Sequence, residues 1–130
     1  MHHERVPAMF WNQHQVLVAT PQGLDGSALV IAADRAGALG ILDASRLEFR
    51  TSVLARLREF GVRSFALRVC PGRVSEEWLA VAGESLVAVV CPASRWEREA
   101  PTNFRRIRDY GPRVLCEVVS AAQAERALAD

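Results

Sequence analysis

Two charged residues stand inside otherwise apolar runs, and their side chains are the ones in this sequence best suited to chemistry. Arg68 lies in the run FALRVC, and Glu117 lies in VLCEVV. Long charged side chains are rarely buried without a partner. An arginine near the end of a strand can hold a phosphate or a carboxylate, and a nearby glutamate can orient a group or take a proton. The alternative interpretation is that the two residues neutralise each other or extend their charged ends into solvent.

A second candidate site is the loop TPQGLDGS, whose first three residues are Thr20, Pro21 and Gln22. Its glycines let a ligand approach the backbone, and the helix that it opens can hold an anion on its first amides. Asp43 ends the next apolar run about 20 residues later, where a dinucleotide-binding unit has its ribose-binding acid. The glycine pattern is not GxGxxG, so an ordinary tight loop is the favoured interpretation of this stretch alone.

Histidine and cysteine are poorly placed for nucleophilic or metal chemistry. All the histidines precede the first apolar run, so no Ser-His or Cys-His dyad can be assembled, and we predict no catalytic residue. Cys70, Cys91 and Cys116 fall near the ends of successive apolar runs and could together bind a soft metal. Their spacing is not that of a metal site, and cysteine often packs as a small apolar residue. We therefore predict no metal site.

The elements that must position these residues alternate along the chain. Short, valine-rich apolar runs predict strands at 16–20, 41–43, 64–70, 86–91 and 113–119. Segments with a helical apolar repeat separate the strands, and their predicted N-terminal caps are Ser27, Thr51 or Ser52, Ser75, and Thr102 or Asn103. Ser120-x-x-Gln123 is a capping-box pattern for a last helix over 121–129. The apolar stripes of the second and fourth helices extend to Phe60 and Tyr110.

Five β-α units in series predict an α/β fold with a parallel sheet and right-handed crossovers. Such a series fits the N-terminal part of a (β/α)8 TIM barrel, which usually needs about 250 residues. It fits equally well a self-contained flavodoxin-like three-layer sandwich, and periodicity does not decide between the two. We expect a single domain over residues 16–130, after an N-terminal extension of residues 1–15.

Composition and charge exclude several functions. The formal net charge is +1 and the charges are interspersed, which argues against a nucleic-acid partner. The 16 basic residues are all arginine, so Schiff-base chemistry and a Walker lysine are excluded. No apolar run reaches the roughly 18 residues of a membrane span, and no secretory signal is evident, so we expect a cytoplasmic protein without a membrane partner.

The order of these segments resembles the nitronate monooxygenase (2-nitropropane dioxygenase) family of flavin-dependent TIM barrels. The stretch VLVATPQGLDGSALVIAADRAGALGILDAS is similar to the family's first strand, loop and small-residue helix. RTSVLARLREFGVRSFALRVCP is similar to the family's next unit, and GPRVLCEVVSAAQAERALAD is similar to its fifth strand and helix. The resemblance implies FMN as the cofactor of the full-length protein, with Thr20, Pro21 and Gln22 beside the flavin and with Arg68 and Glu117 as further cofactor-binding residues.

Our expectation is therefore the N-terminal portion of an FMN-dependent oxidoreductase barrel that is inactive alone. The family's catalytic histidine and its phosphate-binding strands would follow Asp130. The alternative is a non-catalytic structural or interaction domain of a multidomain polyketide synthase, because Ala19, Ala38 and Arg68 differ from the family's residues near the flavin. The expected partners are the rest of the barrel, other domains, or a second copy bound through the edges of the sheet.

Overall fold

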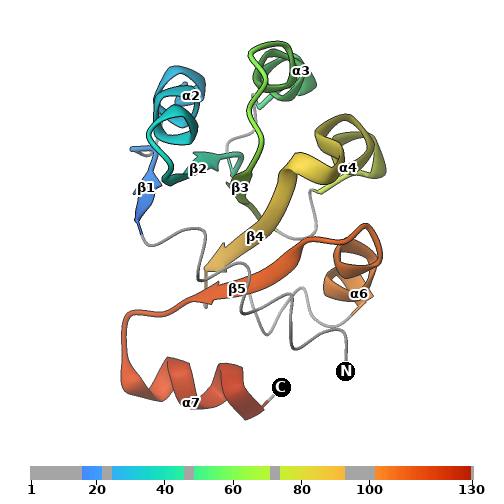
Figure 1. Ribbon diagram of the computed structural model, residues 1–130. Helices are drawn as coiled ribbons and strands as arrows, with labels where there is room; N and C mark the ends of the chain where they lie inside the picture. Colours follow the sequence, from blue (N-terminus) through green and yellow to red (C-terminus); the bar gives the residue numbers. More distant parts are fainter. Residues whose placement is uncertain (1–15, 22–24, 46–48, 71–73, 93–101, 130) are drawn as a thin grey trace, which may run out of the picture.

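A computed structural model describes residues 16–21, 25–45, 49–70, 74–92 and 102–129 of this chain. Strands alternate with helices along these residues (Figure 1). The strands are β1 (Leu17–Ala19), β2 (Leu39–Asp43), β3 (Phe65–Arg68), β4 (Leu86–Pro92) and β5 (Arg113–Glu117). The helices are α2 (Ser27–Arg35), α3 (Thr51–Glu59), α4 (Glu76–Ala82), the short 3₁₀ helix η2 (Gly83–Ser85), α6 (Thr102–Asp109) and α7 (Ala121–Ala129).

The predicted α/β class is confirmed, because the five strands form one parallel sheet. Their order in the sheet is β1-β2-β3-β4-β5, so each strand pairs with the next one along the chain. A flavodoxin-like sheet has the order 2-1-3-4-5, in which the first strand lies inside the sheet. In Figure 1 the strands form a curved row, with α2, α3, α4 and α6 along its outer side and α7 apart from that row.

Several element boundaries differ from those that the sequence predicts. β2 begins at Leu39, earlier than expected, because Leu39 and Gly40 pair with β1. β5 ends at Glu117, earlier than expected, and Glu117 pairs with Pro92, the last residue of β4. The following Val119 is 87% exposed.

The helix caps agree with the sequence at two helices and differ at two others. Ser75 accepts a hydrogen bond from the Trp78 amide, and the Ser120 hydroxyl accepts one from the Gln123 amide, as the predicted capping box requires. The Gln123 Oε1 accepts from the Val119 amide, one residue before the Ser120 amide that a complete capping box uses. By contrast, Gly26 and Arg50 stand at the N-cap positions of α2 and α3, one residue before the earliest predicted caps. At α2 the side chain of Asp25, two residues before Ser27, accepts the Ser27 amide instead.

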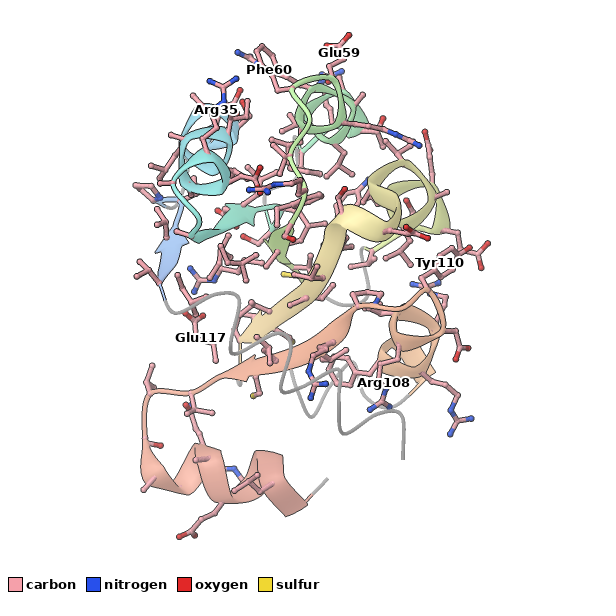
Figure 2. The ribbon with its side chains drawn as sticks, viewed as in Figure 1. Arg35, Glu59, Phe60, Arg108, Tyr110 and Glu117 are labelled. Carbon is pink, nitrogen blue, oxygen red and sulfur yellow. The ribbon has the colours of Figure 1, made fainter. Side chains whose placement is uncertain are left out.

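Two aromatic residues predicted to extend the apolar stripes are exposed. Phe60 is 49% exposed and Tyr110 is 46% exposed, and both lie beyond the last residues of their helices. Figure 2 shows both side chains at the periphery of the molecule. The stripe prediction is therefore wrong at its ends, because the chain turns toward the next strand after α3 and α6.

The main core lies between the sheet and its row of helices. Its members include Leu42, Leu67 and Val89 from the strands and Leu54 and Ile107 from the helices. Alternate residues of the same strands face the opposite side, which we call the inner face. A smaller cluster covers the inner face, with Leu39, Ala66 and Ala88 at its centre and Ile41, Val87 and Leu115 packed against it.

Helix α2 packs unusually close to β2 at Gly40. A Cβ added to Gly40 would lie 2.8 Å from the Val30 Cα, an atom of the helix backbone. Relief would require the helix to move, since a side-chain rotation cannot remove that atom. Gly40 therefore sets the distance between α2 and the sheet.

We expect Gly40→Ala to lower the free energy of unfolding by about 1–3 kcal/mol, because the added methyl group overpacks this contact. Urea denaturation followed by circular dichroism measures the change. Ser52→Ala at an exposed position of α3 is the control, with an expected change within about 0.5 kcal/mol. Equal stability of Gly40→Ala and the wild type would show that α2 is not held at this distance.

Candidate functional site at the carboxyl ends of the strands

Three charged side chains belong to the inner face at the carboxyl ends of the strands. Leu42 and Ala44 belong to the main core, so the residue between them, Asp43, faces the inner side. Arg68 also faces the inner side, because its neighbours Leu67 and Val69 both belong to the main core. On β5 the inner-face residues are Leu115 and then, two residues on, Glu117. This arrangement brings charges from β2, β3 and β5 to one edge of the sheet.

Arg68 and Glu117 form an ion pair across β4. The Arg68 Nη2 donates a hydrogen bond to the Glu117 Oε1 at 2.6 Å, although β4 lies between their strands. The two side chains are 34% and 42% exposed, so water screens the pair, and its contribution to stability is about 0–1 kcal/mol. Figure 2 shows Glu117 on the side of the sheet away from α3, α4 and α6. The structure thus realises mutual neutralisation, one of the two interpretations that the sequence leaves open.

Thr20, the first of the three loop residues, is bonded to β2 and not to this pair. Thr20 is buried, and its hydroxyl donates to the Ile41 carbonyl at 2.7 Å, as does its amide at 2.9 Å. Its side chain packs against Gly26 at the start of α2, on the helix side of the sheet. Pro21 is exposed, and Gln22 lies outside the described residues. Thr20 therefore fastens the loop to β2, and its hydroxyl is already committed to a backbone carbonyl.

Asp43 is a polar residue at this edge that the sequence reasoning left out of its site. It is 2% exposed. Its Oδ1 accepts from the Ser45 amide at 3.1 Å and from the Ser45 hydroxyl at 2.5 Å. Its Oδ2 is buried and has no hydrogen-bond partner among the described residues. The available signal was its position at the end of an apolar strand, where a dinucleotide-binding unit has its ribose-binding acid, but the preceding loop lacks the glycine pattern of such a unit.

The three cysteines do not converge. Cys91 and Cys116 are paired neighbours on β4 and β5, and alternation places both on the helix side of the sheet, with Val89 and Val114. Cys70 lies beyond the end of β3, two residues after Arg68. Among the described residues no group of three or more His, Cys, Asp or Glu side chains is placed to hold a metal.

The pKa of the Cys116 thiol is raised above its ordinary value by burial and, to a lesser extent, by the negative charge of Glu117. Both effects disfavour the thiolate, the form that reacts with electrophiles. We expect Glu117→Gln to lower this pKa and to increase the rate of Cys116 alkylation by iodoacetamide at pH 8 roughly twofold or more. Peptide mass spectrometry separates Cys116 from the other thiols.

Glu125→Gln, which removes an exposed glutamate from α7, is the control for this measurement. Its alkylation rate at Cys116 should equal that of the wild type. If both variants left the rate unchanged, the charge of Glu117 would not reach the thiol.

No protein-family model matches this chain, and a search of curated proteins finds no match. The resemblance to flavin-dependent barrels therefore stays a prediction. Within the described part of the chain, none of the helices is long and apolar enough to cross a membrane.

Proposed function

We propose that this chain forms five consecutive units of a (β/α)8 barrel similar to nitronate monooxygenases, and that the complete barrel is an FMN-dependent oxidoreductase. The observation that supports the barrel best is the sequential strand order, with α2, α3, α4 and α6 along one side of the sheet. In such a barrel the inner-face cluster becomes part of the barrel interior, and ligands bind at the carboxyl ends of the strands. Arg68 and Glu117 lie at that edge.

The described residues fit a flavin in part. The Arg68 guanidinium has five N–H donors. Its hydrogen bond to Glu117 leaves donors for the negative charge of a reduced flavin or of a nitronate oxygen. The Thr20 hydroxyl is bound to a backbone carbonyl, so Thr20 contributes by positioning the first loop. When bound, FMN supplies the electron-transfer chemistry, and these residues orient it and adjust its electrostatics.

The test is an FMN titration followed by flavin fluorescence, on this chain and on a polypeptide that adds three further β-α units. We expect binding by the longer polypeptide alone. Arg68→Gln should weaken that binding about tenfold or more, because a hydrogen bond to a charged group is lost. Arg108→Gln, an exposed arginine on α6, should have no effect. Failure of the longer, folded polypeptide to bind FMN would exclude the flavoenzyme.

A second candidate function is a non-catalytic structural domain, as in a multidomain synthase. The mutual pairing of Arg68 and Glu117 favours it, because each neutralises the charge that a ligand would use. So do the two outer edges of the sheet, on β1 and β5, which have no partner strand in the described residues. Leu17 on β1 is 45% exposed, and Val118 beyond β5 is 38% exposed. Such edges pair readily with another chain.

If the sheet edge at β5 binds a second copy, the chain should sediment as a concentration-dependent dimer. Val119→Lys should shift it toward the monomer, because a charge beside an edge opposes strand pairing. Leu128→Lys is the matched control, since Leu128 on α7 is also 87% exposed. Equal sedimentation of the two variants, or a wild-type monomer at all concentrations, would exclude this interface.

A further inference from the structure

The Oδ2 of Asp43 is buried and has no hydrogen-bond partner among the described residues. A buried carboxylate oxygen without a donor is unfavourable, and the large majority of buried polar groups in proteins do find partners. Asp34, the other buried aspartate of the described chain, shows the usual case. Its Oδ2 accepts from the Arg63 amide at 3.2 Å, and its Oδ1 accepts from the Ser64 amide at 3.3 Å. Within the described part of the chain, Asp43 has such partners on Oδ1 only.

A cation stands beside Asp43 on the same face. Arg68 is the register partner of Asp43 on the neighbouring strand, and strands in a sheet lie about 4.8 Å apart. Among the described residues, Glu117 is the partner of the Arg68 guanidinium. Asp43, whose Oδ2 lacks a donor, and Arg68, whose guanidinium has further N–H donors, therefore lie on neighbouring strands at the carboxyl edge.

The charges of this edge indicate which ligand it fits. Asp43 and Glu117 are two acids against one arginine, so the three side chains have a net charge of −1 when ionised. A simple anion would bind Arg68 but would be repelled by both acids. An ammonium group would donate to the Asp43 Oδ2 and offset the excess negative charge. A carboxylate one carbon away from that ammonium would reach Arg68 across the spacing of one strand.

We propose that the carboxyl edge of β2 and β3 binds the zwitterionic head of a small α-amino acid. The ammonium donates to the Asp43 Oδ2, and the carboxylate accepts from the Arg68 guanidinium. Ser45 already occupies Oδ1, so Oδ2 is the oxygen left for the ligand. This site does not require flavin, so it goes beyond the oxidoreductase proposal and can be tested with no cofactor present.

The experiment is a titration of the full chain with L-alanine, followed by the backbone amide shifts of residues 43–45 and 68–70 in NMR spectra. Propionate lacks the ammonium group, ethylamine lacks the carboxylate, and L-lactate replaces the ammonium with a hydroxyl. We expect L-alanine to bind at least tenfold more tightly than any of the three. Equal binding of lactate would overturn the ammonium assignment, and binding of propionate alone would leave a bare anion site at Arg68. No shift with L-alanine would also overturn the proposal.

Two variants locate the site. Asp43→Asn keeps an oxygen for Ser45 and replaces the unpaired oxygen with an NH₂ group, so it should keep the fold and weaken L-alanine binding at least tenfold. Arg68→Gln should do the same by removing the carboxylate's partner. Asp109→Asn and Arg108→Gln, both exposed on α6, are the charge-matched controls and should bind as the wild type does. Unchanged binding in Asp43→Asn would overturn the proposal whatever the outcome of the FMN titration.

Discussion

The structure depends on the sequential crossover, in which each helix returns the chain to the strand directly beside the last one. Because parallel crossovers are right-handed, repetition in one direction places successive helices on the same side of the sheet. The large side chains of the main core, such as Phe65, Leu42 and Leu67, fill that side. At the centre of the inner face stand Leu39, Ala66 and Ala88, two of which are alanines. Small inner side chains suit a sheet that curves around them.

The two buried aspartates show how the two ends of the sheet differ. Asp34 lies in the last turn of α2 and binds amides just before β3, so both of its oxygens hold a helix to the start of a strand. Asp43 lies at the end of β2, and half of its hydrogen-bonding capacity is used on its own turn. The amino end of the sheet thus uses its buried charge for stability. At the carboxyl end, where α/β folds bind their ligands, the Asp43 Oδ2 has no partner among the described residues.

The alternation of apolar runs was enough to predict the α/β class, because buried parallel strands and amphipathic helices differ in period. It was not enough for details that depend on a neighbouring strand. β5 ends at Glu117, the register partner of the last residue of β4, and no pattern within VLCEVV reveals this pairing. The side of Thr20 depends on its register against β2, and the sequence alone groups it with Arg68. The unpaired oxygen of Asp43 is a property of three-dimensional packing and has no local signal.

The Arg68–Glu117 pair links the competing interpretations of this edge. A half-exposed pair contributes little to stability, so its separation by a ligand costs little. The pair would therefore stabilise the fold little, and a ligand could readily replace Glu117 as the hydrogen-bond partner of Arg68. Asp43 differs, because its burial makes the lack of a donor for its Oδ2 among the described residues unfavourable. A ligand that donates to the Asp43 Oδ2 would therefore gain more binding free energy than a ligand that only takes the place of Glu117. On this argument Asp43, more than the Arg68–Glu117 pair, would determine what the edge binds.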